Sequence, residues 1–406
     1  MCACACGSMG TVIDLARERA LTPGCLDRVF LDSAGSSLPV STVVDTVIGH
    51  LLREAEVGGY RAAAERKEDL AAVPASLARL IGCASDEIAL ADSATRAWNL
   101  FVTALRWSPG DRILICGTEY ASNAIALLQR ARYDGCSVEV VPSLPDGGPD
   151  LDAYANLLDE RVRLVSLVHV PTNSGRIAPV KAMAALAHDV GALVLLDACQ
   201  SVGQLALDVV DLGVDAMSAT GRKWLRAPRG TGFLYVRRSL LADLEPAAVD
   251  LRGGAWTGPD SYQLRPDAAR FELWETDVAG RLGLGVAADH LLALDPADVE
   301  AAVRSGADDL RHQLGGLPGV RVRDQGDDLS GIVSFTVSDV DPVRVQAQLH
   351  ESGVTVSVSE VGSTRLDMGA RGLDAVVRAS PHYFVSPEDR RRAVAAIAQV
   401  TAQPAH

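Results

Sequence analysis

Short apolar runs alternate with stretches of helical periodicity between residues 89 and 236. The clearest apolar runs span 111–116, 136–141, 164–168 and 192–196. Strands that alternate with helices in this way form a mostly parallel sheet with right-handed crossovers and a covering of helices. The sequence therefore predicts an α/β fold whose ligands bind just beyond the carboxyl ends of the strands.

The strongest chemical signal begins where the 192–196 run ends. Asp197 follows the run directly, Gln200 comes soon after, and Lys223 stands further on among small and hydroxylated residues. In isolation such an aspartate is more often a turn or helix-cap residue, and a single lysine is usually a surface charge. Together, between two apolar runs, they predict a site for pyridoxal phosphate (PLP) held by the lysine as a Schiff base.

Each of these residues has a physical role in such a site. The lysine must be a nucleophilic amine, and a partly desolvated site beside other cations lowers the pKa of a lysine. Arg222, Arg226 and Arg229 are the candidate cations near Lys223. A buried carboxylate keeps the ring nitrogen of PLP protonated, so that the ring accepts electrons; Asp197 is the candidate.

Two further polar side chains are assigned to the same cofactor site. Gln200 follows the aspartate closely enough to donate a hydrogen bond to the phenolic oxygen of the ring. Thr220 and Arg222 lie within three residues of Lys223. Both Thr220 and Arg222 are therefore expected to bind the cofactor.

The phosphate of the cofactor is assigned to Ala94 and Thr95. These residues follow a strand-like run and begin a predicted helix that extends to about residue 105. Free backbone N–H groups and the positive end of the helix dipole make such a helix start an anion site. An ordinary Ser/Thr helix cap gives the same local sequence.

Several segments resemble one known family. The segments at 197–200, around Lys223 and at 378–383 are similar to class V aminotransferases of the cysteine-desulfurase type, which are fold type I PLP enzymes. The segments at 31–34 and 54–60 resemble more closely the PLP-dependent C–S lyases of ergothioneine biosynthesis and their lincosamide-pathway relatives. The resemblance extends from about residue 31 to about residue 400. It implies a large domain with a mostly parallel sheet flanked by helices, and a smaller α+β domain.

The length of 406 residues exceeds what one hydrophobic core usually supports, so more than one domain is expected. We expect an N-terminal tail and arm at 1–30, of which about the first ten residues are disordered. A large PLP-binding domain is expected at 31–260 and a small C-terminal domain at 261–406.

Charge and hydropathy exclude several partner classes. The formal net charge is -14 and the isoelectric point is about 5.0, which argues against nucleic acid or an anionic membrane as partner. No apolar run approaches the roughly 20 residues that span a bilayer. The start of the chain lacks the basic and apolar regions of a secretory signal.

The cysteines indicate a cytoplasmic protein without a metal site. Five are scattered in mostly apolar settings and are expected to be buried free thiols in a reducing compartment: Cys25, Cys83, Cys116, Cys136 and Cys199. The alternating Cys2, Cys4 and Cys6 of the N-terminal tail match no zinc-binding spacing, and no histidine lies near them.

The resemblance adds further cofactor residues. Family members commonly carry a histidine that stacks on the PLP ring, and Tyr120 is its match in this chain, offering an aromatic face. Thr172 and Asn173 follow the 164–168 run and are expected to donate hydrogen bonds to cofactor or substrate. Core packing for the tyrosine and an ordinary β-turn for the other two are the alternatives.

Four residues are expected to bind substrate. Arg378 matches the family's arginine, and bidentate recognition of an α-carboxylate is a natural task for a guanidinium. A surface salt bridge is the alternative. The resemblance places Ala34 and Gly35 at the substrate mouth, where a tight turn would have the same sequence, and it adds Tyr60.

The resemblance also implies a homodimer with shared active sites. In the family, the loop that corresponds to residues Gly254 to Thr257 reaches the neighbouring subunit's site and contacts the phosphate. We therefore expect this loop to complete the partner's cofactor site.

One absence separates the reactions that this framework supports. A cysteine desulfurase needs a nucleophilic thiol on a small-domain loop, and no cysteine follows Cys199. We therefore expect a C–S lyase that cleaves an S-substituted cysteine, or its sulfoxide, by β-elimination to thiol, pyruvate and ammonia. A decarboxylating oxidative deaminase is the alternative, and a transaminase or epimerase is a weaker one. A non-catalytic PLP-fold protein would lack Lys223 or Asp197.

Overall fold

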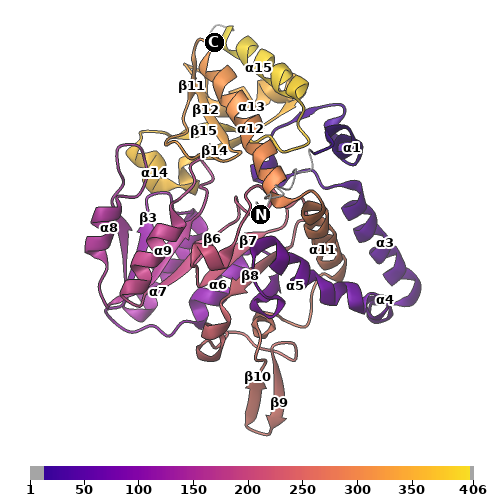
Figure 1. Ribbon diagram of the computed structural model, residues 1–406, viewed down its shortest axis with the longest axis vertical. Coiled ribbons are helices and arrows are strands. Elements are labelled where there is room, and N and C mark those ends of the chain that lie inside the picture. The colour runs from indigo at the N-terminus through magenta and orange to yellow at the C-terminus, as the bar shows by residue number, and fades with distance from the viewer. Residues whose placement is uncertain (1–12, 403–406) are drawn as a thin grey trace, which may run out of the picture.

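The computed structural model describes residues 13–402, so the tail with Cys2, Cys4 and Cys6 lies outside the described residues. A large seven-stranded sheet and a smaller four-stranded sheet organise the chain (Figure 1). Within residues 13–402, no helix combines the length and the apolar character needed to cross a membrane.

The large sheet has the strand order β2-β8-β7-β6-β5-β3-β4. Only β8 runs antiparallel to its neighbours, which confirms the mostly parallel α/β prediction. The strands are β2 (Ile88–Ala91), β3 (Arg112–Cys116), β4 (Ser137–Val141), β5 (Val162–Val168), β6 (Leu193–Asp197), β7 (Ala216–Thr220) and β8 (Gly232–Val236).

Helices bury both faces of this sheet, which explains why its strands appear as continuous apolar runs. Leu195 of β6 packs in a cluster with α6 and α7, whereas Leu196 packs in the cluster that contains α5, α9 and α11. The helices are α5 (Lys67–Ile81), α6 (Ala94–Ala104), α7 (Ala121–Asp134), α8 (Leu151–Leu157), α9 (Val180–Asp189), α10 (Val209–Leu212) and α11 (Val278–Ala293). Residue alternation along β6 therefore decides which helices each side chain meets.

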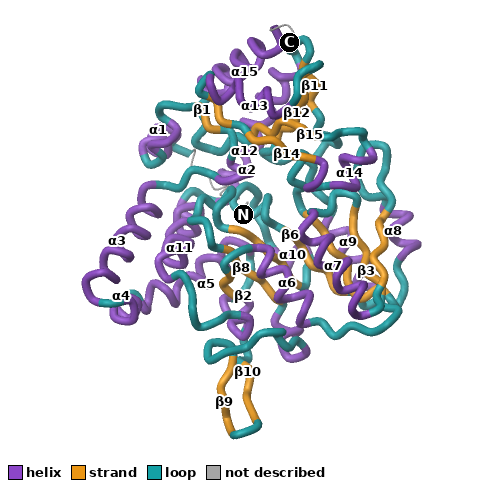
Figure 2. Tube along the Cα trace, turned by 180° about the vertical axis from the view of Figure 1, so that it is seen from behind, coloured by secondary structure: helices purple, strands orange, loops and turns teal. Residues whose placement is uncertain are grey.

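The N-terminal part of the chain forms a separate two-stranded sheet with a segment of the last third. Residues Val29–Phe30 form β1, which pairs in parallel with β13 (Val354–Thr355) far along the sequence. The remaining N-terminal elements are α1 (Leu15–Ala20), α2 (Ser33–Ser36), α3 (Ser41–Val57) and α4 (Gly59–Glu65). Figure 2 shows β1 close to the small sheet and α3 extending away from it.

The segment from Gly254 to Thr257 is a strand and not the loop that was predicted. β9 (Gly254–Gly258) pairs with β10 (Ser261–Leu264) as an antiparallel hairpin. This hairpin projects from the end of the molecule opposite the small sheet (Figure 1).

The small sheet is antiparallel and has the order β11-β12-β15-β14. Helices pack on it from the last third of the chain, in the α+β arrangement that was predicted. The elements are α12 (Pro296–Gly315), β11 (Val320–Val322), β12 (Val333–Val337), α13 (Pro342–Glu351), β14 (Ser357–Glu360), α14 (Arg365–Ala370), β15 (Ala375–Ala379) and α15 (Pro387–Ala402).

The pairing of β9 with β10 and the packing of α11 indicate where the two domains meet. A boundary at 260/261 would fall inside the β9–β10 hairpin, and α11 packs against α3 and α5 of the large domain. We therefore propose a boundary near Asp295, between α11 and α12, with β1 added to the small domain.

Arg226 ties three distant segments together beneath the small domain. Its guanidinium is buried and donates hydrogen bonds to the Leu38 carbonyl (2.8 Å), to Thr22 Oγ1 (2.5 Å) and to the Tyr383 hydroxyl (2.5 Å). It also lies over the ring of Phe384, 4.5 Å from the centroid, at a distance typical of cation–π contacts. Its backbone φ is +60°, so the surrounding contacts hold a conformation that non-glycine residues seldom adopt.

Candidate active site

The site lies at the carboxyl edge of the parallel strands. Asp197 is the last residue of β6, and the loop that follows β7 carries Lys223. Parallel neighbours end at the same edge of a sheet, and the negative charge of Asp197 acts on the amine of Lys223. The structure therefore brings the two most distinctive predicted residues together.

The carboxylate of Asp197 is buried and held from two sides. Its Oδ1 accepts the backbone N–H of Cys199 at 2.9 Å, and its Oδ2 accepts the side-chain amide of Asn123 at 2.9 Å. A carboxylate oxygen has two lone pairs, so each oxygen keeps acceptor capacity for a further donor. This is the acceptor that a protonated ring nitrogen requires.

The amine of Lys223 has neither a hydrogen bond nor an ion pair with any side chain between residues 13 and 402. Burial lowers its pKa from the ordinary value of 10.5, and the charges of Arg222 and Arg378 act in the same direction. Cys199 and Asp197 partly oppose this shift. A buried amine with a lowered pKa is a suitable nucleophile and base.

The predicted cations around the lysine are only partly correct. Arg222 acts on the amine as expected and donates a hydrogen bond to Thr220 Oγ1 at 3.1 Å. Arg226 instead points into the domain junction, as described above, and Arg229 is exposed to solvent. Arg378, from the small domain, is the second cation.

The start of α6 has the free donors expected of a phosphate site. Ser93 caps the helix by accepting the N–H of Arg96 at 3.2 Å. The N–H groups of Ala94 and Thr95 have no acceptor in the part of the chain that is described. A Cβ on Gly232 would lie 3.1 Å from the Ala94 nitrogen, so this glycine lets β8 pass close to the helix start.

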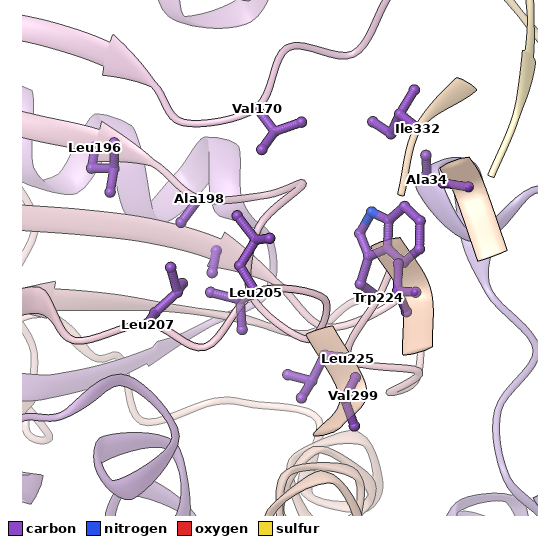
Figure 3. Close-up of a cluster of buried hydrophobic side chains, with 14 of the residues drawn as sticks. Ala34, Val170, Leu196, Ala198, Leu205, Leu207, Trp224, Leu225, Val299 and Ile332 are labelled. Carbon is purple, nitrogen blue, oxygen red and sulfur yellow. The ribbon is translucent and has the colours of Figure 1, made fainter. Parts of the chain in front are cut away.

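Both polar atoms of the Gln200 side-chain amide form hydrogen bonds. Its Nε2 donates to the Ala34 carbonyl at 3.0 Å, and its Oε1 accepts the indole N–H of Trp224 at 2.9 Å. Figure 3 shows Trp224 in the buried cluster together with Ala34 and Ile332. In this arrangement the amide anchors the loop that carries Lys223, and one Nε2 hydrogen remains for the predicted bond to the cofactor.

Thr172 and Asn173 contact the small domain. Both the Oγ1 and the carbonyl of Thr172 accept hydrogen bonds from Arg378, at 2.6 and 2.9 Å. The Nδ2 of Asn173 donates to Asp367 of α14 at 2.6 Å, while its buried Oδ1 has no partner between residues 13 and 402. Tyr120 directly precedes α7.

Each nitrogen of the Arg378 guanidinium has a partner, and the contact of Nη2 is the longest. Its Nη1 binds Thr172 and its Nε donates to Ser357 Oγ at 3.1 Å. Its Nη2 faces Asp32 Oδ1 at 3.6 Å, which is longer than a hydrogen bond. A Cβ on Gly35 would lie 2.4 Å from that carboxylate oxygen, so Asp32 packs directly on the glycine.

Tyr60 is not brought to this site. It lies on α4 with 84% of its surface exposed. With Leu51 and Trp274 it lines a hollow of ≈ 500 Å³ on the outer side of the large domain. Within one chain it therefore has no contact with the residues around Lys223.

Sequence reasoning missed four residues of the site: Glu119, Asn123, Ser166 and Asp367. Glu119 and Asn123 stand four positions apart directly after the 111–116 run, at the edge where the site was expected. That position and spacing could have marked them. Nothing local marks Ser166 or Asp367, because their partners lie far away along the chain.

These groups fit PLP: a partly buried amine without a partner among the described residues, a buried carboxylate with acceptor capacity, and a helix start with free N–H groups. The fold and the site thus define a PLP-dependent enzyme of fold type I. Residues 29–391 match the family model "Aminotransferase class-V", and the chain belongs to that family.

Named relatives fall into two groups. The chain is 31% identical to "Probable cysteine desulfurase 2" of Mycobacterium leprae, over 95% of this chain and 96% of that protein. It is 30% identical to "Probable hercynylcysteine sulfoxide lyase" of Mycobacterium tuberculosis, over 92% and 90%. The crystal structure of the cysteine desulfurase CsdA from Escherichia coli shares the fold, with a TM-score of 0.89, 23% identity, and coverage of 97% and 99%.

Covalent attachment of the cofactor should depend on Lys223 alone. The chain has three lysines, and Lys67 and Lys181 are exposed. After addition of PLP and reduction with borohydride, peptide mass spectrometry should find the cofactor on Lys223. The rate of attachment should reach half its maximum below pH 10.5, because the lowered pKa frees the amine at a lower pH.

In the Lys223→Ala variant this adduct should disappear completely. Lys67→Ala and Lys181→Ala are the matched controls and should retain it. A reduced adduct on another lysine of the wild-type enzyme would contradict the assignment.

Proposed function

We propose that this enzyme is a C–S lyase that cleaves an S-substituted cysteine, or its sulfoxide, by β-elimination. The observation that carries the proposal is the absence of any cysteine after Cys199. A desulfurase needs a thiol on the small domain that attacks the substrate sulfur, whereas elimination needs none.

The segment that would have to supply this thiol lies over the loop after β5. Asp367 of α14 accepts a hydrogen bond from Asn173, so α14 and the preceding residues Val361–Ser363 are held near the site. This segment offers Ser363 and Thr364 and contains no thiol. The residues present therefore favour elimination over persulfide formation.

The chain's own groups account for the steps of such a reaction. PLP supplies an electron sink for negative charge at the α-carbon of an attached amino acid. Arg378 binds the α-carboxylate through its Nη2 end, where the substrate would replace the contact with Asp32, and the amine of Lys223 takes the α-proton. The buried carboxylate of Asp197 would keep the ring nitrogen protonated. An S-substituted cysteine and water then yield thiol, pyruvate and ammonia, whereas its sulfoxide yields a sulfenic acid in place of the thiol, with no oxidant or reductant required.

A cysteine desulfurase is the second candidate, because the family includes relatives with that name. The named sulfoxide lyase relative supports a bulky S-conjugate as substrate, and with it a role in the biosynthesis of a sulfur-containing natural product. The free thiols of the described chain fit a cytoplasmic location.

An assay with S-alkyl cysteine conjugates and their sulfoxides tests the reaction. We expect pyruvate and ammonia in a ratio of one to one, measured with lactate dehydrogenase and glutamate dehydrogenase. For the conjugates we also expect one free thiol for each pyruvate. Free cysteine, tested alone and with dithiothreitol, is the comparison substrate.

Each other product pattern would reject the elimination. Alanine together with sulfide from free cysteine would establish the desulfurase. Carbon dioxide, an aldehyde and peroxide from the conjugate would establish an oxidative deaminase.

Arg378→Lys should raise the KM for the conjugate about tenfold or more, because a lysine cannot reproduce the fork of donors that a carboxylate accepts. The turnover number should change less than KM. Arg321→Lys, on exposed β11 of the same small sheet, is the control and should keep the wild-type KM. An unchanged KM in Arg378→Lys would exclude Arg378 as the carboxylate site.

We further propose a homodimer in which the hairpin of one subunit completes the site of the other. Helix α3 exposes an apolar stripe of Val44, Ile48, Leu51 and Leu52. Such a stripe on a surface helix normally packs against another element. The projecting hairpin exposes Trp256 in the same way, at 77%.

Replacing both Leu51 and Leu52 by Glu should convert the dimer to a monomer, because four charged carboxylates would be buried at the interface. Light scattering after size exclusion reports the mass, and the monomer should bind PLP more weakly than the dimer. The control replaces Ile125 and Leu128 of α7, which are equally exposed, by Glu. A dimeric Leu51/Leu52 variant would refute the proposed interface.

A further inference from the structure

A chain of buried polar groups extends from Asp197 into the large domain. The Nδ2 of Asn123 donates one hydrogen bond to Asp197 Oδ2 at 2.9 Å and another to Glu119 Oε1 at 3.0 Å. Glu119 also accepts the N–H of Tyr120 at 2.8 Å and the hydroxyl of Ser166. The side chains of this network come from α7, β5 and the segment after β3, all on the α7 face of the sheet.

The two carboxylates determine how the Asn123 amide is oriented. A side-chain amide has two N–H hydrogens and one carbonyl oxygen. Both hydrogens of Asn123 are used, one for each carboxylate. Turning the amide over would place its oxygen against two acceptors, so Glu119 and Asp197 together specify the orientation that donates.

Glu119 is unusual for a buried acid. It is 3% exposed, and no cation in the described chain pairs with it. Burial raises its pKa to about 7, and the charge of Asp197 contributes in the same direction. Burying such a group is costly, and no contact with the proposed substrate site explains its presence.

We propose that Asn123 and Glu119 are positioning residues that hold the Asp197 carboxylate toward the ring nitrogen of PLP. The inference rests on the proposed placement of the cofactor ring at Asp197. Asn123 fixes one oxygen of Asp197 and the Cys199 backbone fixes the other, so the carboxylate cannot rotate. Glu119 acts through Asn123, because its hydrogen bond holds the amide in the donating orientation.

The network makes a prediction for the bound cofactor that does not depend on turnover. If the Asp197 carboxylate turns away from the ring, the enzyme binds the cofactor more weakly and the orientation of the cofactor changes. Loss of a hydrogen bond to a charged group corresponds to a factor of about ten or more in affinity. The dissociation constant of PLP and the visible circular dichroism of the bound cofactor report these two effects separately from the reaction.

The test compares four variants of the full-length enzyme, each titrated with PLP. Asn123→Ala removes the bridging amide, and Asn123→Asp keeps its size but replaces the donor. Both should raise the dissociation constant of PLP about tenfold or more and weaken the visible circular dichroism. Glu119→Ala should do the same, whereas Glu119→Gln should stay within about threefold of wild type, because its amide oxygen still accepts from Asn123.

Asn156→Ala, an exposed asparagine on α8, is the matched control and should behave as wild type. Wild-type affinity and circular dichroism in Asn123→Asp would overturn the proposal, as would equal losses in Glu119→Gln and Glu119→Ala. If Asn123→Ala does not fold, the isosteric Asn123→Asp and the Glu119 pair still decide the outcome. An enzyme that shows these cofactor effects yet releases no thiol from any conjugate would refute the proposed lyase and leave the positioning role standing.

Discussion

The register of β6 between its two parallel neighbours is the constraint on which the active site depends. Val168 of β5 pairs with Asp197, and Asp197 pairs with Ser218 of β7. A shift of one residue would turn the carboxylate to the opposite face of the sheet, away from Asn123 and toward α9. Apolar side chains on both faces of β6 fix this register, since Leu195 and Leu196 are buried among different helices. The core of the sheet thereby orients the acid.

The sequence predicted the strands of the large sheet and the placement of Asp197 and Lys223 in one site because both depend on local signals. Apolar runs of fixed length indicate strands, and strand ends indicate the edge where ligands bind. The partner Asn123 was missed because it lies 74 residues from Asp197, and its position after the 111–116 run does not by itself show which carboxylate it contacts. The hairpin at Gly254 to Thr257 was read as a loop because its glycine-rich, solvent-exposed residues lack the apolar alternation of a half-buried strand.

The two domains meet at the proposed substrate site. Arg378 belongs to the small sheet, yet it binds Thr172 of the large domain and its charge acts on Lys223. Asp367 and Asn173 form a second link nearby. In the proposed site, substrate binding and domain position are thus linked through one guanidinium, because any motion of the small sheet changes the distance from Arg378 to the amine of Lys223.

The pairing of β1 with β13 has a consequence for how the protein is made. The small domain takes its first strand from residues Val29–Phe30 and its other strands from the last third of the chain. During synthesis β1 therefore remains unpaired until most of the polypeptide has left the ribosome. A fragment that contains only the C-terminal part of the chain would lack this strand and expose the edge of β13. The smaller domain is therefore the last part of the protein to be completed, although one of its strands is among the first segments to emerge.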